Sequence, residues 1–449
     1  MTNHEQNTSP ITFSATDQNT GSTLSNRTGG TAKPTLRNRL RTGAAGLVLA
    51  AMLATTACST ANSVEATSET SSTGSSASSS TATETTTSSD QSGTGSAAEV
   101  QALAEAFADT LDDEQRAQLY QDYSFDNASN WSNFPQQLLQ NGMGGMGAPG
   151  EQDASAGSSS ESSSTSSSSS SSGRVGLDLG SLNEEQRSAL EELMKAAMGS
   201  EDNEGYDEVM SILAADDYLA EQNASSTEYG SDNYYIAFLG EPTDSGTWEL
   251  QFGGHHLAVS NTYTDGELVS ATPSFRGTEP TGEFTYDGET YDPLTQETHA
   301  FTALLDSLTD EQRAEAEIDQ SNLLLGPGSD WQFPEEAEGI KVSELTDEQK
   351  QLVLDAIATY VDDLPEEQAA EYMQRYEAEL DDTYISFSGN SDFASVGDYV
   401  RIDGPSVWIE LAMQNGVATS TPHIHSVWRD SETDYAGLTA EEETDTSQS

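Results

Sequence analysis

Residues 233–240 read Asn-Tyr-Tyr-Ile-Ala-Phe-Leu-Gly, and residues 382–389 read Asp-Thr-Tyr-Ile-Ser-Phe-Ser-Gly. Both runs contain the aromatic and β-branched residues that favour β-strands, and both end at a glycine. Each run follows a block with helical signals, so a helix-then-strand order occurs twice along the chain. We therefore expect an α+β fold of two halves of similar plan, which share or abut a largely antiparallel sheet.

A short pattern marks helix starts in both halves. It occurs as Leu111-Asp-Asp-Glu-Gln-Arg116, Leu182-Asn-Glu-Glu-Gln-Arg187, Leu308-Thr-Asp-Glu-Gln-Arg313 and Leu345-Thr-Asp-Glu-Gln-Lys350, with a looser copy at Leu364-Pro-Glu-Glu-Gln368. In the four close copies, a side chain that can cap a helix is followed three residues later by Gln, the spacing of a capping box. Acidic residues fill the first turn, where the helix dipole favours them. The pattern thus predicts helix N-termini rather than a functional motif.

Further strands are expected around the two opening runs. They are predicted at residues 247–252, 255–263, 267–275, 399–402, 405–412 and 423–429. Asp265-Gly266 lies between two of these runs, and an Asp-Gly pair in that position predicts a hairpin turn. The two strand-rich blocks contain most of the residues that are candidates for catalysis or binding.

The composition limits the classes of function. The chain has 449 residues, 77 acidic against 16 basic, and a formal net charge of −61 at pH 7. Contacts with nucleic-acid phosphates need clustered Lys and Arg, so this acidity argues against a nucleic-acid partner. It also argues against docking on an anionic membrane through a basic patch. A single cysteine excludes an intramolecular disulfide framework and cysteine-based zinc sites.

The N-terminal segment has the features of an export signal. Five basic residues precede an apolar run at residues 42–57, which ends in small residues before Cys58. This order is typical of secretory signals, and the run is shorter than the roughly 20 residues that span a bilayer. Leu53-Ala-Thr-Thr-Ala-Cys58 resembles a bacterial lipobox. We expect residues 1–57 to be an export signal with a long basic N-region, and Cys58 to carry a lipid that anchors the protein to the outer face of the cell membrane. Secretion after ordinary cleavage is the alternative.

Three low-complexity tracts bound the expected folded part. Residues 58–97 are a Ser/Thr-rich stalk, residues 142–173 a Gly/Met/Ser-rich insertion, and residues 436–449 an acidic tail. Such compositions bury too little apolar surface to offset the entropy of ordering, so we expect them to be disordered. Residues 98–435 then form a single α+β domain that the insertion interrupts. Without residues 1–57 the chain keeps 11 basic and 75 acidic residues, a net charge of −64.

Four of the six histidines form two tight pairs in the strand-rich blocks. His255 and His256 lie in the first half, and His423 and His425 lie in the second. Alternate residues of a strand share a face, so His423 and His425 can bind one metal ion together. His255 and His256 would point to opposite faces unless Gly253-Gly254 forms a bulge. If the halves share a sheet, three imidazoles converge near its centre, a donor set that suits Zn, Cu or Fe.

Charged side chains near these pairs complete the candidate site. Glu249 and Glu410 occupy matching places in the two halves and are candidates for an acid/base pair. Either is also the nearest candidate for a carboxylate ligand beside the histidines, ahead of Asp430. Arg429 is the candidate for binding a substrate anion. The alternative is structural, because paired histidines also make buried hydrogen bonds. In that case Arg276, Arg401 and Arg429 pair with carboxylates.

Several of these motifs resemble one family. They are Gly253-Gly-His-His-Leu257, Thr272-Pro-Ser-Phe-Arg-Gly-Thr-Glu-Pro280, the repeated Leu-x-x-Glu-Gln-Arg, and His423-Ile-His-Ser-Val-Trp-Arg-Asp430 followed by Asp434-Tyr435. Together they resemble the uncharacterised bacterial family called domain of unknown function 3500, over roughly residues 98–436, with the Ser-rich tract as a departure. The resemblance implies no catalytic residues, because the family has no assigned activity.

The sequence leaves two classes of function open. The first is an extracytoplasmic, lipid-anchored protein with a His-rich metal or ligand site. As an enzyme, it would be a metal-dependent hydrolase or an oxygen-using enzyme. The second is a non-catalytic cell-surface binding protein whose His and Arg residues are structural. The expected partners are the membrane, through Cys58, and a small-molecule or polymer ligand of unspecified identity.

Overall fold

The computed structural model describes residues 95–135, 173–223, 227–327 and 332–439. The predicted export signal and Cys58 lie outside these ranges, as do nearly all of the predicted stalk and insertion and most of the predicted acidic tail. Within the described ranges, no helix is both long enough and apolar enough to cross a membrane.

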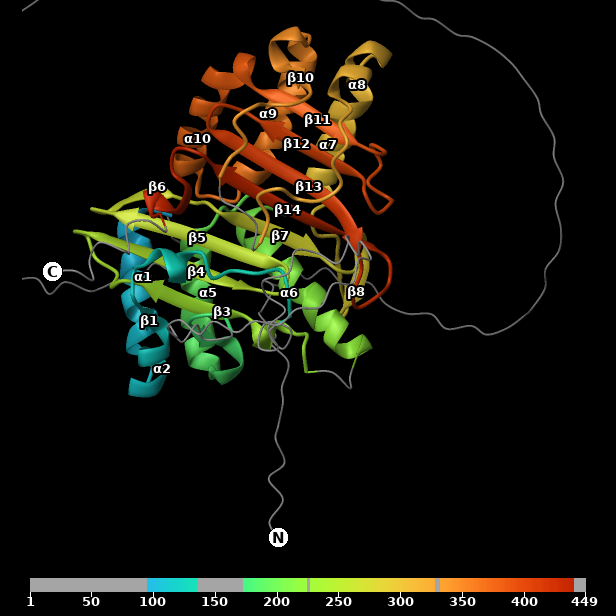
Figure 1. The fold of residues 1–449 in the computed structure, drawn as a ribbon. Coiled ribbons are helices and arrows are strands. Elements are labelled where there is room, and N and C mark those ends of the chain that lie inside the picture. The colour runs from blue at the N-terminus through green and yellow to red at the C-terminus, as the bar shows by residue number, and fades with distance from the viewer. Residues whose placement is uncertain (1–94, 136–172, 224–226, 328–331, 440–449) are drawn as a thin grey trace, which may run out of the picture. The chain divides into compact units, whose positions relative to one another are not determined.

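Most of the described strands form one sheet of 12 strands, and two more form a separate hairpin. The sheet order is β1-β3-β4-β5-β7-β14-β13-β12-β11-β10 (Figure 1). In addition, β2 pairs with β3, and β6 pairs with β5. The strands are β1 (Tyr120–Gln121), β2 (Leu177–Asp178), β3 (Tyr235–Leu239), β4 (Thr247–Gly254), β5 (Leu257–Thr264), β6 (Glu267–Ser270), β7 (Ser274–Thr278), β8 (Phe284–Tyr286), β9 (Glu289–Tyr291), β10 (Ile340–Lys341), β11 (Tyr384–Ser388), β12 (Tyr399–Asp403), β13 (Val407–Asn415) and β14 (Pro422–Asp430). All neighbours run antiparallel except β1 and β3.

The two halves meet at one pair of strands, β7 from the first half and β14 from the second. Gly277 pairs with His425 across this junction. On its other side β7 pairs with the start of β5, where Arg276 lies opposite Leu257. The order of elements is helices and then strands in each half, so the structure confirms the predicted α+β fold of two similar halves that share a largely antiparallel sheet.

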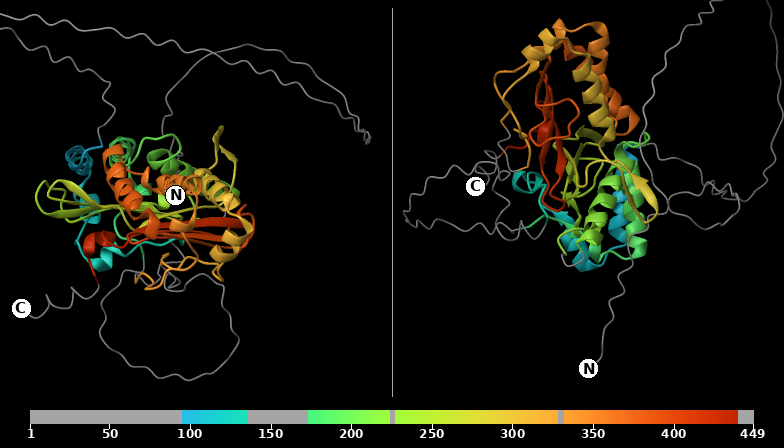
Figure 2. Two further views of the ribbon diagram at one scale, coloured as in Figure 1. Left: turned by 90° about the horizontal axis from the view of Figure 1, so that it is seen from above. Right: turned by 90° about the vertical axis from the view of Figure 1, so that its right-hand side faces the viewer.

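The long helices cover one face of this sheet (Figure 2). The described α-helices are α1 (Ala97–Asp109), α2 (Asp113–Leu119), α3 (Phe125–Ala128), α5 (Glu184–Ala197), α6 (Gly205–Gln222), α7 (Thr295–Ser307), α8 (Asp310–Ala316), α9 (Asp347–Val361) and α10 (Glu366–Glu379). Helices α1, α5 and α6 bury residues such as Phe107 and Ile212 in one core with Phe238 of β3. Helices α7, α9 and α10 bury residues such as Phe301 and Ile357 in a second core, with the strands of the second half. Each such side chain contributes about 1.5–3 kcal/mol on burial.

The opposite face of the sheet has its own, smaller cores. On β3, Ile236 faces the helices, whereas its neighbour Ala237 packs with Phe125 of α3 and with Tyr435. Because side chains alternate along a strand, each strand in the sheet's middle presents one set of residues to the helices and another to this second face. The candidate site described below lies on the second face.

The capping boxes form as the sequence predicts. Helices α2, α5, α8 and α9 each begin with a box in which the cap and the Gln three residues later exchange hydrogen bonds. Gln115 donates to Gln186 in the first half at 3.2 Å, and Gln312 donates to Gln349 in the second at 3.1 Å. The pattern therefore occurs in pairs because the glutamines of two capping boxes bind each other and so join two helix N-termini in each half. The looser copy differs, since Pro365 precedes α10 without a side-chain cap.

Several predicted strand ranges differ from the structure, and the run predicted at 405–412, for example, forms β13 at residues 407–415. The run at 267–275 divides into β6 and β7, and residues 271–273 between them are not in a strand. Strand β5 begins at Leu257 rather than at residue 255, which changes the geometry of the first histidine pair. The Asp265-Gly266 hairpin turn between β5 and β6 is confirmed, with φ values of 52° and 83° that this turn type requires.

Candidate metal centre

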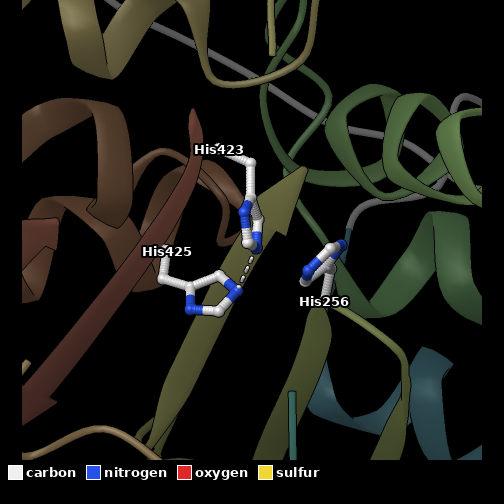
Figure 3. Close-up of side chains that lie close together, drawn as sticks. All are labelled: His256, His423 and His425. Atoms are coloured by element: carbon white, nitrogen blue, oxygen red, sulfur yellow. Dashed lines mark hydrogen bonds between the residues drawn. The ribbon is translucent and has the colours of Figure 1, made fainter. Parts of the chain in front are cut away.

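The shared sheet brings the two histidine pairs together. His423 and His425 lie on β14 and point to the same face, because they are two residues apart. His256 directly precedes β5, which pairs with β7, and β7 pairs with β14. As a result, ring nitrogens of His256, His423 and His425 all lie within 4.8 Å of one another (Figure 3).

The histidines of the first pair form a turn rather than part of a strand. His255 and His256 connect β4 to β5, and His256 has a left-handed φ of 69°. A bulge at Gly253-Gly254, which would have let both histidines join the second pair, does not form, because both glycines pair in regular register within β4. Their missing side chains serve close packing instead, since a Cβ on Gly254 would lie 2.6 Å from the ring of Tyr234. The turn gives the two imidazoles different partners. A regular strand would also have separated them, because it would have placed them on opposite faces.

His255 supports the centre from one side. Its Nδ1 lies 2.6 Å from Oδ1 of Asp216, and its ring stacks on His256 with 3.7 Å between ring centroids. The hydroxyl of Tyr234 donates a hydrogen bond to the His255 carbonyl. These contacts fix the turn and the orientation of the neighbouring ring, so His255 is a positioning residue for His256.

The spacing of the three converging imidazoles fits a small metal ion. Nε2 of His423 and Nε2 of His425 are 2.9 Å apart, and the ring of His256 lies 5.1 Å from each of the other two ring centroids. Around a tetrahedral zinc ion with Zn–N distances of about 2.0–2.1 Å, ligand nitrogens lie roughly 3.3 Å apart. Small ring movements therefore suffice to place all three nitrogens around one ion.

A glycine makes room for this arrangement. Gly277 lies on β7 between β5 and β14, beneath the rings. A Cβ at this position would come within 3.0 Å of Cδ2 of His425 and 3.1 Å of Cδ2 of His256. Any side chain here would press on two of the three rings, so the approach of the imidazoles depends on Gly277.

The environment keeps the three imidazoles neutral near pH 7. Burial lowers the pKa of His256 and of His425 well below the usual value, and the neighbouring imidazoles lower it further. Burial also lowers the pKa of His423 to about 4, although the carboxylate of Glu279 opposes this shift. Neutral imidazole is the form that binds metal ions, so the donor set is ready for a metal at physiological pH.

The three histidines form part of the wall of a pocket of about 390 Å³. Its other walls come from both halves and include Asn133, Glu279, Val396 and Val417. The side chains of Val396 and Val417 are 48% and 62% exposed, the two exposed large hydrophobic residues among the described residues. Asn133 Nδ2 lies 3.4 Å from Nδ1 of His425. A ligand in this pocket would meet imidazoles at one end and apolar side chains at the opening.

Glu279 fixes one wall of the pocket. Its carboxylate accepts hydrogen bonds from the main-chain N–H groups of Val417, Ala418 and Thr419 and from the Thr419 hydroxyl, at 2.5–3.3 Å. Burial alone would raise the pKa of Glu279, but the bonds from Thr419 and the nearby His423 bring it below its usual value. The resulting carboxylate holds the loop after β13 against the histidines.

Comparison with known families identifies the chain. The model of a family described as a protein of unknown function, DUF3500, matches residues 154–437, which is more than half of the chain. The chain belongs to the DUF3500 family. No curated protein and no solved structure matches it. The family description assigns no activity, so the function of this DUF3500 chain has to be argued from its own site.

Three other predicted site residues lie elsewhere in the DUF3500 fold. The described residues that line the pocket include neither Glu249 nor Glu410 nor Arg429. The Glu410 carboxylate accepts hydrogen bonds from Tyr399, Trp408 and two main-chain N–H groups, at 2.6–2.9 Å. These four donors occupy it fully, so it anchors a loop onto β13.

Arg429 and Glu249 also have structural surroundings. Arg429 forms an ion pair with Asp434 and donates to a main-chain carbonyl at 2.9 Å. Burial raises the pKa of Glu249 to about 8, and hydrogen bonds from Thr262 and Gln251 oppose the shift. Glu249 lies on β4, which is separated from the junction strand β7 by β5. Glu410 lies on β13, which is directly beside the junction strand β14. The expectation that the two glutamates occupy matching places is therefore wrong.

Several residues of the centre gave no recognisable signal in the DUF3500 sequence. Gly277, Glu279 and Asp216 are ordinary residues of strands, strand ends and helices until the fold places them beside the imidazoles. Gly277 and Glu279 do lie within the Thr272–Pro280 run that carries the family resemblance. Without the sheet order, however, nothing in that run connects it to His423 and His425.

Proposed function

We propose that this protein binds a transition metal ion through His256, His423 and His425, with an open coordination position toward the pocket. The observation that carries the proposal is the convergence of three buried imidazoles, whose ring nitrogens lie within 4.8 Å of one another. Three protein ligands and one open position are typical of catalytic rather than structural zinc sites. Imidazole donors suit Zn, Cu and Fe, so the metal class follows from the ligands.

Such a metal, when bound, would supply a Lewis acid for hydrolysis or a centre for oxygen chemistry. The residues of the chain would do the rest. The His255–Asp216 pair orients His256, Glu279 holds the pocket wall, and Asn133 offers a polar contact beside His425. The substrate we infer is a small molecule with an apolar part, because Val396 and Val417 line the opening.

The second candidate function is non-catalytic binding of a ligand at the same pocket. The observation in its favour is that Glu410 and Arg429 are fully occupied by structural partners, so neither is free to act on a substrate. In that case the metal-loaded protein would bind a ligand without turning it over. Assays of the metal-loaded protein with ester, amide and phosphoester substrates, and for oxygen consumption, distinguish the two.

We further propose that the protein is a lipoprotein on the outer face of the cell membrane. The support is the sequence alone, namely the basic and apolar N-terminal segments and a single cysteine, Cys58, placed after small residues. The variant Cys58→Ser should release protein from the membrane fraction into the medium. An unchanged membrane fraction would count against the anchor.

The metal proposal is tested by metal content. Untagged protein is stripped with a chelator, exposed separately to Zn²⁺, Cu²⁺, Fe²⁺ and Mn²⁺, dialysed and analysed for metals. We expect about one equivalent of a transition metal, and much less in His256→Gln and His423→Gln. The matched control is His299→Gln, because His299 is exposed on α7 and should leave the metal content unchanged. Sub-stoichiometric metal in the wild-type protein would remove the proposal.

A further inference from the structure

A second buried cluster of charged residues lies on the other face of β7. The carboxyl groups of four residues, Glu204, Glu208, Glu297 and Asp363, interact electrostatically with the guanidinium of Arg276. Glu208 and Glu297 are 1% exposed, and Arg276 is 2% exposed. Arg276 precedes Gly277 on the strand, so its side chain points toward the helices while Gly277 faces the histidines.

Both halves of the protein contribute to this cluster. Glu204 directly precedes α6, and Glu208 lies in the first turns of that helix. Glu297 lies in the first turn of α7, and Asp363 lies between α9 and α10. Oxygens of Glu204, Glu208 and Asp363 all lie within 4.8 Å of one another. The cluster therefore joins helices of the first half to helices of the second.

Arg276 compensates only part of the negative charge. Its guanidinium donates to Glu208 at 3.1 Å and to Asp363 at 2.8 Å. Asp363 also accepts a hydrogen bond from the main-chain N–H of Gly205 at 2.7 Å. Four carboxylates against one guanidinium leave a formal charge of −3. A buried charge of that size is very unfavourable unless protons or a cation compensate it.

Three buried carboxylate oxygens in this cluster lack partners. Oε2 of Glu204, Oε1 of Glu208 and Oε2 of Glu297 are buried and accept no hydrogen bond from the described residues. Glu208 and Glu297 lie within hydrogen-bonding distance of each other, and this hydrogen bond requires one of the two to be protonated. Buried polar groups in folded proteins almost always have partners, so these oxygens indicate bound protons or a cation that the protein chain itself does not supply.

We propose that Glu204, Glu208, Glu297 and Asp363 bind a hard divalent cation, for which Ca²⁺ is the best match. The donors are all carboxylate oxygens, which Ca²⁺, Mg²⁺ and Mn²⁺ prefer to nitrogen donors. Mg²⁺ usually keeps several waters and takes one or two carboxylates, whereas Ca²⁺ accepts six to eight oxygens in flexible geometry. A buried set of four carboxylates matches Ca²⁺, and the ion reduces the formal charge to −1.

Acidic residues also lead from the surface toward the cluster. Glu201 is exposed and Asp362 is partly exposed, and Asp362 interacts electrostatically with both Glu201 and Asp363. A cation approaching from solvent would therefore meet negative charge along the way. In the metal-free protein, burial and the neighbouring carboxylates raise the pKa of Glu204 to about 10. Protons then take the place of the cation, and calcium binding should release them.

Calcium binding to chelator-treated, untagged protein tests the proposal. Isothermal titration with CaCl₂ should detect one tight site above the weak binding of a highly acidic surface, and Ca²⁺ should raise the melting temperature. The variants Glu204→Gln and Glu297→Gln keep the side-chain shape and remove one charge. They should weaken the tight site at least about 10-fold, the effect expected even for residues that only support a metal ligand.

The control variant is Glu311→Gln, because Glu311 is an exposed acid in the first turn of α8. It should bind Ca²⁺ as the wild type does, and all three variants should keep Zn²⁺ binding at the histidines. Two results would overturn the proposal. One is a wild-type protein with no tight site and no thermal shift at about 10 mM Ca²⁺, above the weakest protein calcium sites. The other is wild-type affinity in both cluster variants.

Discussion

Arg276 and Gly277 are neighbours on β7, yet the clusters on the two faces of the strand differ in almost every respect. On the Gly277 face, nitrogen donors converge beside a pocket. On the Arg276 face, oxygen donors converge beneath the helices. The strand is the same, so the difference comes from what packs on each side. The pocket face meets a turn and loops, whereas the helix face receives the acidic first turns of α6 and α7.

The clusters nevertheless obey one electrostatic rule. Burial disfavours the charged form of any side chain, so it lowers the pKa of a histidine and raises that of a carboxylic acid. The pKa of His423 falls to about 4, and that of Glu204 rises to about 10. Both clusters are thus close to neutral without a metal, and each offers a different kind of ligand to one.

The largest expected effect follows removal of the only basic residue in the carboxylate cluster. Arg276→Met leaves four buried carboxylates without their guanidinium, and breaking a buried ion pair from one side costs about 3–5 kcal/mol in the free energy of unfolding. Urea unfolding at pH 7 measures the change. The control is Lys350→Met, whose exposed ion pair with Asp381 should contribute less than about 1 kcal/mol. Similar losses of unfolding free energy in both variants would show that the charge of Arg276 matters no more to stability than that of an exposed ion pair.

The next effect is a pH dependence of opposite sign in the two clusters. The folded pKa of His423 is depressed from 6.5 to about 4. Its contribution is complete above pH 6.5 and is lost as the pH falls toward 4, about 3 kcal/mol in the free energy of unfolding. Glu204 has a raised folded pKa, so its contribution is complete below pH 4.5 and is lost as the pH rises toward 10.

Urea unfolding of metal-free protein across this pH range checks the signs. His423→Gln should flatten the acidic side of the stability profile and leave the alkaline side unchanged. Glu204→Gln should do the reverse, and each variant is the other's control. If both variants flattened the same side, the two clusters would not differ as described.

A smaller effect should separate the metal sites themselves. Gly277→Ala places a Cβ about 3 Å from the rings of His256 and His425, so the imidazoles must shift by a few tenths of an ångström. We expect transition-metal affinity to fall about 10-fold, as for other disturbances of ligand orientation. Competition with a chromogenic chelator measures it. Ca²⁺ affinity should not change, and equal losses at both sites would indicate general damage to the fold.

The smallest expected change follows replacement of a carboxylate that the sequence placed in the site. Glu410→Gln weakens the hydrogen bonds from Tyr399 and Trp408, so the protein should become less stable. Its affinity for Zn²⁺ and for Ca²⁺ should each change by less than about two-fold, because Glu410 lies in neither cluster. A large loss of Zn²⁺ binding with intact stability would indicate that Glu410 takes part in metal binding.

The sequence predicted much of the fold because its signals there are local. The capping boxes depend on residues three apart, and the Asp265-Gly266 hairpin depends on two adjacent ones. The division of the run at 267–275 was missed although the sequence marks it, because Pro273 cannot donate a hydrogen bond to a neighbouring strand. Local patterns also located His423 and His425 on one face, since alternation along a strand needs no tertiary contact.

The carboxylate cluster could not be predicted, because three of its members look like routine helix starts and the fourth, Asp363, lies in a short connection between two helices. Acidic residues in the first turn favour any helix, and Glu208 and Glu297 carry no further signal. Their burial depends on α6 and α7 packing beside Arg276, which only the arrangement of the two halves determines. The same holds for Gly277 and the histidines.

The sequence by itself determined the α+β class, the two similar halves, the helix starts and the pairing of histidines, because propensity, capping and alternation act within a few residues. The tertiary structure alone decided that β7 lies beside β14 and that His255 turns toward Asp216 while His256 joins His423 and His425. It also decided that four acids from three separate regions of the chain share one buried space. Such contacts depend on strand order and helix packing over long sequence separations, which no local pattern records.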